Sequence, residues 1–502
     1  MSSEHVKNAA VGALVAATLI GGVIAVAAVG DPGGGARPAP GPAGRARAAV
    51  ALGAPAAPAD LNALIADRER WLAEHPEDGE SWAELGTAYA ERGARQADWA
   101  ALGRAERALG RSLDVLPAAE GNTEALTGLA VLANARQDFT AARGYAEQAR
   151  KQRPRRWTVY PALIEAYTGL GAYKKAGSAL EAMQKLYEGP QARGVAARLY
   201  RVRGWREDAA STAYDSAAGA DGPAEKGAAL LRLGDLAWER GEPAEALTAY
   251  DLSLRLAPGA RDTLAARGRA LAALERTEEA LRDYQAALAG SPRPEHALEA
   301  GELYQSLGLG GDAESQYEKV RTAAARAAEH GGNQELVIGR WEADHGDPAE
   351  AAELLRAEWD GGRRSIEVAD ALAWALFRSG RAKEALPYAR KATEEGMRSP
   401  LFFYHRGEIE RALGRYGPAR RFIGQALRIN PYFSPLLVSG ARDALEALGE
   451  PPPGGPRKVT GREGLLKPRL APRRGAGTGS TGAGGTAGAA PGRTAAGAAG
   501  GR

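Results

Sequence analysis

The sequence predicts an all-α fold, a solenoid of about ten helix-turn-helix units stacked side by side. A short pattern of glycine, acidic residues and alanine, clearest at residues 241–246, recurs at intervals that are mostly 33 or 34 residues. The apolar content comes chiefly from Ala and Leu, and the whole chain of 502 residues has only six Phe. A fixed period of this length indicates one supersecondary unit stacked on copies of itself.

Small residues recur in phase with this period. The units can be laid out from the first residues Gly79, Thr123, Trp157, Pro190, Gly227, Arg261, Pro294, Gly332, Ile366 and Pro400. The eighth residue is Gly or Ala in most units, and the twentieth is Ala in most of them. Two antiparallel helices need small residues where they cross most closely, because the side chains at the crossing set the distance between the axes. Longer intervals are interpreted as loop insertions, the largest at residues 94–103.

Apolar positions at helical spacing extend beyond the repeats at both ends. Residues 61–73 place Leu61, Leu64, Ile65 and Leu72 on one face, and residues 432–448 do the same with Leu436, Leu437, Ala441, Leu445 and Leu448. The terminal units of a solenoid would otherwise expose an apolar face. We therefore expect a capping helix at each end of an array that spans residues 60–449.

The first unit carries the spacing Trp82-x-x-Leu85-Gly86-x-x-Tyr89. With the 34-residue period and the alanine at the twentieth place, this resembles the tetratricopeptide repeat, over most of residues 79–431. The resemblance implies a right-handed superhelix whose first helices line a concave groove, and a protein or peptide partner bound in that groove. The units that begin at Pro190 and Gly332 lack some of the large residues usual in the family, which puts their packing in doubt.

Carried onto this chain, the resemblance places a set of acidic and aromatic residues in the groove. The candidate partner-binding residues are Asp235, Trp238, Arg269, Glu302, Asp370, Trp374, Phe377, Tyr404 and Glu408. The aromatic members would anchor an apolar or basic extended peptide, or alternatively fill gaps between neighbouring units. Family members that clamp acidic chaperone tails use Lys and Asn at the fifth and ninth places. Here those places hold Ala83 and Thr87, then Thr127 and Val131, so that use is not expected.

The amino-terminal part divides into three predicted segments. Residues 1–8 form a short cytoplasmic start, and residues 9–30 are uncharged and mostly apolar, long enough to cross a bilayer as a helix. Residues 31–59, rich in Pro, Gly and Ala, are expected to be a disordered linker. The chain would then be a single-pass membrane protein with an extracytoplasmic array. Alternatively, cleavage before Ala28 would release a secreted binding protein with a metal or polymer ligand.

Residues 450–502 are expected to be a disordered tail rich in Gly, Ala and Pro. From Pro451 onward the tail carries nine basic residues against one acid, Glu463, whereas the repeat array is net acidic. An anionic surface is one candidate partner for the tail, and a merely solubilising role is the other. No aromatic residues are interleaved with its basic residues, so a specific nucleic-acid partner is not predicted.

The sequence offers no constellation typical of catalysis. It contains no Cys and six His, and it lacks the His-Glu-x-x-His and phosphate-loop patterns. The pairs Glu342/His345 and His405/Glu408 each place an acid and an imidazole on one helix face, but such metal sites need more ligands. We therefore expect no enzyme activity, no cofactor and no metal, and predict a membrane-tethered interaction adaptor or assembly scaffold.

Overall fold

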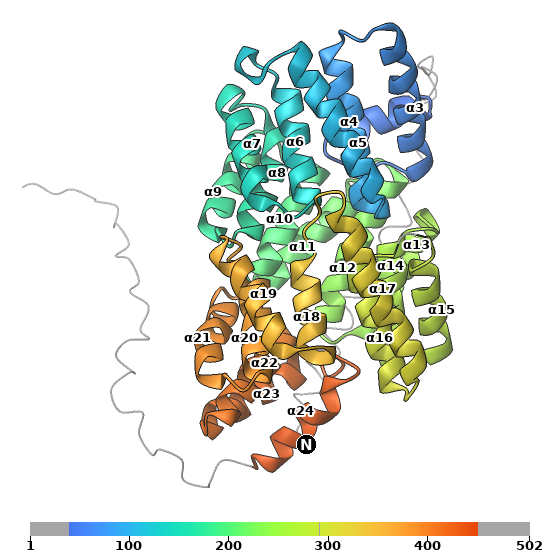
Figure 1. Cartoon of the computed structure of the whole chain (residues 1–502). Coiled ribbons are helices and arrows are strands. Elements are labelled where there is room, and N and C mark those ends of the chain that lie inside the picture. The colour runs from blue at the N-terminus through green and yellow to red at the C-terminus, as the bar shows by residue number, and fades with distance from the viewer. Residues whose placement is uncertain (1–39, 291, 450–502) are drawn as a thin grey trace, which may run out of the picture. The chain divides into compact units, whose positions relative to one another are not determined.

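The computed structural model describes residues 40–290 and 292–449, and in this part of the chain every regular element is helical. Ten helix pairs follow one another (Figure 1). Units one to five are α4 (Gly79–Gln96) with α5 (Trp99–Val115), α6 (Thr123–Ala135) with α7 (Phe139–Gln152), α8 (Tyr160–Gly169) with α9 (Tyr173–Gln184), α10 (Pro190–Val202) with α11 (Arg206–Ala218), and α12 (Pro223–Glu239) with α13 (Pro243–Leu256). The predicted solenoid of helix-turn-helix units is confirmed.

Units six to ten continue the pattern. They are α14 (Arg261–Ala273) with α15 (Thr277–Ala287), α16 (Pro294–Ser306) with α17 (Gly310–Ala328), α18 (Glu335–His345) with α19 (Pro348–Asp360), α20 (Ile366–Arg378) with α21 (Ala382–Glu394), and α22 (Pro400–Ala412) with α23 (Tyr416–Ile429). Short 3₁₀ segments, η2 (Ala118–Glu120) and η3 (Trp157–Val159), precede units two and three. The helices α3 (Pro58–Glu74) and α24 (Leu437–Ala447) flank the array where capping helices were expected.

The crossing of the two helices in a unit explains the small eighth residue. A Cβ added at Gly234 would lie 2.3 Å from the Tyr250 ring, and one at Gly86 would lie 2.5 Å from Leu109 Cγ. The alanine at the twentieth place is equally enclosed, since Ala246 and Ala280 are fully buried. Both periodic positions therefore mark close contact between helices, as the sequence predicted.

Enlarging one of these alanines tests that assignment. We expect Ala246→Leu to lower the free energy of unfolding by about 1 to 3 kcal/mol, because the fully buried methyl lies against Tyr250 and Ala270 in one cluster. The matched control is Ala244→Leu, on the exposed face of the same helix α13. Denaturant unfolding followed by circular dichroism measures both. Equal stability of the two variants would refute the crossing.

Two predictions about loops are wrong. The extra residues of unit one do not form a loop at 94–103, because α4 and α5 are each longer than most helices of the array and meet at a tight turn around Ala97 and Asp98. The expected linker 31–59 contains a ten-residue helix, α2 (Pro42–Ala51). Arg45 Nε donates to Asp60 Oδ2 of α3 at 2.9 Å, and Arg47 Nε donates to Glu84 Oε1 of α4 at 2.6 Å. These two contacts hold α2 against the array.

Contacts between units far apart in sequence are the main feature that the repeat pattern did not indicate. In each of units one to five, the turn between the two helices contacts a loop much further along the chain. That loop follows the unit that lies five places later, so the turn of unit three contacts the loop after unit eight. We call these the five-unit contacts. Tyr173 OH accepts from the Ile366 N–H at 2.8 Å, 193 residues away, and Asn430 Nδ2 donates to the Trp238 carbonyl at 2.7 Å, 192 residues away. Arg293 likewise donates to the Ala94 carbonyl, and the Asn333 N–H donates to the Arg136 carbonyl at 2.8 Å.

Glycines allow the backbones to meet at three of these contacts. Gly171, Gly204 and Gly241 have φ values of +69°, +75° and +77° and stand in the turns of units three, four and five. A Cβ at Gly171 would lie 2.0 Å from the Arg364 carbonyl oxygen, and one at Gly204 would lie 1.9 Å from that of Gly396. The first five units and the last five are therefore joined through their backbones.

The predictions for residues 1–8, 9–30 and 450–502 fall on segments outside the described residues. Within residues 40–290 and 292–449, no helix combines the length and the apolar character needed to span a bilayer.

Candidate functional site

A cavity of about 550 Å³ lies among the first helices of units four, five, six, eight, nine and ten. Its charged lining residues are Arg198 and Arg201 of α10, Arg232, Asp235 and Glu239 of α12, Arg269 of α14, Arg340 of α18 and Glu367 of α20. Its apolar lining includes Trp238, Met397, Phe402 and Phe433. The volume is in the range usual for ligand sites, and the mixture of aromatic and charged groups is typical of them.

The five-unit contacts complete this cavity. The loop after unit nine lies on Gly204, which brings Met397 and Phe402 to the cavity, and the loop after unit ten lies on Gly241 and the Trp238 carbonyl, which brings Phe433. The cavity thus combines a wall from α10, α12 and α14 with residues almost 200 positions further along the chain. Neither half of the array contains it alone.

Three of the predicted residues, Asp235, Trp238 and Arg269, line the cavity together. The Arg269 guanidinium lies 5.2 Å from the centre of the Trp238 ring, and its Nη1 is 3.1 Å from Glu299 Oε1. Asp235 Oδ1 accepts a hydrogen bond from Tyr250 OH at 2.9 Å and lies 3.5 Å from Arg269 Nη2. Arg269 is therefore shared between two carboxylates and an aromatic face.

Burial raises the pKa of the Asp235 carboxyl to about 6, against the opposing effects of Arg269 and Tyr250. Its side chain keeps 38% of its surface exposed, and Asp235 is part of the cavity lining. Burial also lowers the pKa of the Arg269 guanidinium, but Glu299 and Asp235 outweigh it and the net shift is upward. Arg269 therefore stays charged, whereas Asp235 can take up a proton in mildly acidic solution.

Sequence reasoning missed most of the arginines in the cavity. Arg198 and Arg340 occupy the ninth place of the units that begin at Pro190 and Gly332, the same place that Asp235 and Arg269 occupy in their units. These two units lacked the large residues typical of the family, so their ninth places were not counted. The fold shows regular helix pairs in both units, and the same count would have identified both residues.

Glu302, also predicted, lies away from the cavity and faces His345. Its Oε1 is 3.9 Å from His345 Nε2, and the His345 ring stacks on Tyr317 with centroids 4.3 Å apart. Burial raises the pKa of the Glu302 carboxyl, and contact with His345 opposes this shift. This pair links α16 to α18 and is not part of the cavity.

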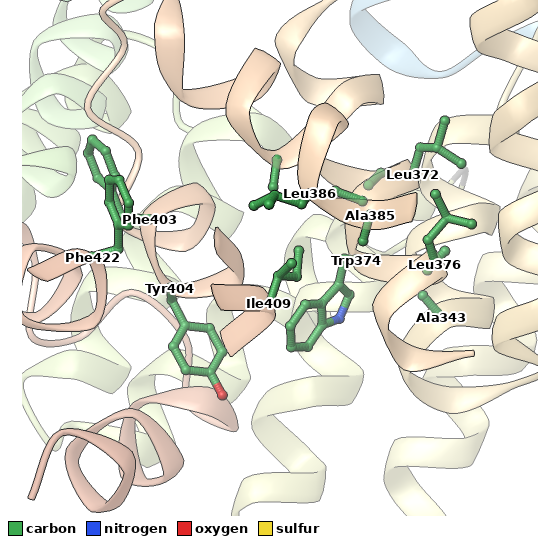
Figure 2. Close-up of a cluster of buried hydrophobic side chains, with 14 of the residues drawn as sticks. Ala343, Leu372, Trp374, Leu376, Ala385, Leu386, Phe403, Tyr404, Ile409 and Phe422 are labelled. Atoms are coloured by element: carbon green, nitrogen blue, oxygen red, sulfur yellow. The ribbon is translucent and has the colours of Figure 1, made fainter. Parts of the chain in front are cut away.

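Asp370, Trp374 and Tyr404 were expected to face a ligand, but they lie outside the cavity lining and are 1%, 5% and 7% exposed. Trp374 and Tyr404 belong to a large apolar cluster with Ile409 and Leu376 (Figure 2). The Trp374 ring stacks on His405 at 4.0 Å, and its Nε1 donates to Asp344 Oδ1 at 2.9 Å. The alternative interpretation, that these aromatics fill gaps between units, describes the structure.

The remaining two predicted residues belong to the same region. Phe377 is half-buried against Trp374, with ring centroids 5.1 Å apart. Glu408 is buried and accepts from Arg411 Nη2 at 2.6 Å. Of the nine predicted residues, the structure therefore brings three into the cavity and places six in packing or ion-pair contacts within and between units seven to ten.

A second cavity, of about 460 Å³, lies between α3, α4 and α5. The Arg104 guanidinium lies 5.2 Å from the centre of the Tyr89 ring, whose hydroxyl donates to Glu69. None of the predicted residues lines it, so we treat it as part of the capping contact. Among the described residues, no group of three or more His, Asp or Glu side chains could hold a metal ion.

Comparison with known proteins finds one family model that matches parts of the chain. The tetratricopeptide repeat family model matches residues 195–261 and 371–432, which fall on units four and five and on units nine and ten. No curated protein matches the chain.

Among solved structures, a tetratricopeptide repeat protein from Parabacteroides merdae is 19% identical, with 52% of this chain and 99% of that chain covered and a TM-score of 0.32. Human IFIT1, solved as a dimer with PPP-AAAA, is 14% identical, with coverages of 63% and 72% and a TM-score of 0.41. MamA protein is 18% identical, with coverages of 33% and 90% and a TM-score of 0.26.

Proposed function

We propose that this tetratricopeptide-like solenoid is a non-enzymatic interaction scaffold that binds a segment of a partner protein at the cavity beside α12. One observation carries the proposal. Asp235, Trp238 and Arg269 were selected by their place in the repeat, and they meet residues of five other segments around one cavity. Tetratricopeptide arrays generally bind protein or peptide partners, which agrees with this use of the inward positions.

The chemistry of the lining favours binding over catalysis. Trp238, Phe402 and Phe433 offer apolar surface for an anchoring side chain, and charged groups around them would fix its orientation. The lining includes no His, Lys or Tyr, and the hydroxyl of Ser399 caps α22 by accepting from the Phe402 N–H. The ionisable groups there are carboxylates and guanidinium groups, several of which pair with one another.

Filling the cavity tests the proposal. We expect Leu401→Trp, at a half-buried lining position, to lower partner recovery at least about tenfold in proximity labelling and cross-linking from the native cell. The matched control is Leu309→Trp at an exposed position, which should recover as much partner as the parent. Circular dichroism should show both variants folded. Undiminished recovery with a folded Leu401→Trp would place the partner elsewhere.

We further propose that residues 9–30 tether the scaffold to a membrane with the array outside the cytoplasm, and that the basic tail contacts an anionic surface. The uncharged apolar composition of residues 9–30 supports the tether, and the nine basic residues support the tail contact. Sequencing the amino terminus of the mature protein from membrane and supernatant fractions tests the tether. A supernatant chain that begins near Ala28 would instead favour the secreted binding protein.

A further inference from the structure

The cavity contains more positive charge than its own carboxylates neutralise. Arg201 pairs with Glu239, and Arg269 pairs with Asp235 and Glu299. Among the described residues, no carboxylate forms an ion pair with the other three lining arginines, Arg198, Arg232 and Arg340. Arg232 and Arg340 are half-buried and Arg198 is exposed, so the three guanidinium groups leave an excess of positive charge at the wall and mouth of one cavity. Partial burial of a cation without a carboxylate partner is costly, and this excess requires an explanation.

Arg232 is the clearest case. Its Nη2 lies 3.4 Å from Ser216 Oγ, and its Nε is buried without a hydrogen-bond partner among the described residues. The guanidinium reaches this place across Gly194, where a Cβ would lie 3.0 Å from Nη2. Burial lowers the pKa of Arg232 to about 9, and repulsion by Arg198 and Arg95 contributes to the shift. The cation is thus half-buried, weakly hydrogen-bonded and next to other cations.

The nearby acids do not compensate for these cations. Burial lowers the pKa of Arg198 and the charge of Glu165 opposes this shift, but the two residues form no ion pair, and Arg95 is bound by Glu91 at 2.9 Å. Glu225 and Asp235 act on Arg232 only from a distance, and Asp235 is already engaged by Arg269 and Tyr250. Glu367 acts on Arg201 and Arg363. The excess positive charge therefore remains at the cavity.

We propose that Arg198, Arg232 and Arg340 form a binding site for a ligand that carries several phosphoryl groups. Guanidinium groups match phosphate oxygens in pairs and keep their charge, which suits them to this ligand class. A single carboxylate would leave two of the three cations without a partner, whereas a polyphosphate group balances all three. The cavity volume of about 550 Å³ accommodates a group of this size.

The inferred phosphoryl site lies in the same cavity as the proposed partner site. It depends on the proposed function only because both use this cavity. The phosphoryl groups come either from inorganic polyphosphate or from a nucleotide. Because both probes are small molecules and no partner protein is present in the assay, the two proposals can fail separately.

The test is isothermal titration of the full chain with inorganic tripolyphosphate and, separately, with ATP. We expect saturable binding of tripolyphosphate, and a loss of affinity of about ten- to a hundredfold for each arginine removed in Arg198→Gln and Arg232→Gln. The control is Arg255→Gln with Arg326→Gln, two exposed arginines in the last turns of α13 and α17, which removes the same charge without touching the cavity. Equal affinity for the two probes would show that the phosphoryl groups alone account for binding. Tighter binding of ATP would show that the ligand is a nucleotide.

Thermal unfolding gives a second readout that a structural role would not produce. In phosphate-free buffer we expect Arg232→Met to unfold at a higher temperature than the parent, because it removes an unpaired buried cation. Tripolyphosphate should raise the midpoint of the parent more than that of Arg232→Met at the same concentration. The proposal is overturned if neither probe binds, if the control variant loses as much affinity as the cavity variant, or if hexaglutamate binds more tightly than tripolyphosphate through the same arginines.

Discussion

Trp374→Ala is expected to lower the free energy of unfolding by about 3 to 5 kcal/mol, the cost usual for removing a large buried aromatic side chain. The indole is 5% exposed and packs between units eight, nine and ten, where it stacks on His405 and donates to Asp344. Its removal would leave a hole in the apolar cluster of Figure 2 and would uncover the buried Asp370–His405 pair, whose carboxylate and imidazole lie 3.0 Å apart. Denaturant titration followed by far-ultraviolet circular dichroism measures the loss.

Two controls separate packing from the other contacts of this residue. Trp374→Phe keeps most of the ring volume and loses the hydrogen bond to Asp344, so we expect a smaller loss, of about 1 to 2 kcal/mol. Tyr416→Ala removes an aromatic side chain that is 60% exposed and should change stability by less than about 0.5 kcal/mol. If Trp374→Ala proved no more destabilising than Tyr416→Ala, Trp374 would be a surface residue and the groove interpretation would return.

Gly204→Ala is expected to destabilise the protein by about 2 to 5 kcal/mol through two separate effects. The left-handed backbone at φ +75° costs a residue with a Cβ about 1 to 2 kcal/mol. The new methyl would also meet the Gly396 carbonyl oxygen at 1.9 Å, so one backbone must move at a cost of about 1 to 3 kcal/mol. Amide hydrogen exchange should then rise in residues 395–402, where this contact holds the chain.

The chain provides a matched control for this substitution. Gly380 stands in the corresponding turn of unit nine with φ +80°, and nothing lies within 4 Å of its added Cβ. Gly380→Ala therefore carries the same backbone strain without the contact across five units. The difference in unfolding free energy between the two variants measures that contact. Equal values, with exchange in 395–402 unchanged, would contradict the closure of the cavity at this point.

The parts of the fold that depend on neighbouring units could be predicted from the sequence. The small residues at the eighth and twentieth places indicate where the two helices of a unit cross closely. The structure shows a helix pair in each unit that carries these small residues. The segment 42–51 could not be predicted in this way, because it has no amphipathic pattern. Its helix depends on the contacts of Arg45 and Arg47 with Asp60 and Glu84.

The site was predictable only in part, for a geometric reason. The repeat count places Asp235, Trp238 and Arg269 on inward positions, and the structure agrees. The same count places Trp374 and Glu408 there too, but neighbouring units and α24 cover that part of the array. Which inward positions stay open depends on small rotations added up over five units, and no local pattern records that sum. The groove was expected to be acidic, but the cavity lining includes arginines from the two weakly patterned units, whose ninth places were not counted.

The five-unit contacts also constrain how this chain can change its length. An ordinary solenoid tolerates the gain or loss of an internal repeat, since each repeat touches only its neighbours. Here, removing one repeat between the third and the eighth would bring the turn of unit three, at Gly171, opposite a different loop from the one it contacts now, and would shift the other five-unit contacts that span the removed repeat. These contacts therefore constrain the number of repeats between the third and the eighth more tightly than stacking of neighbours alone would.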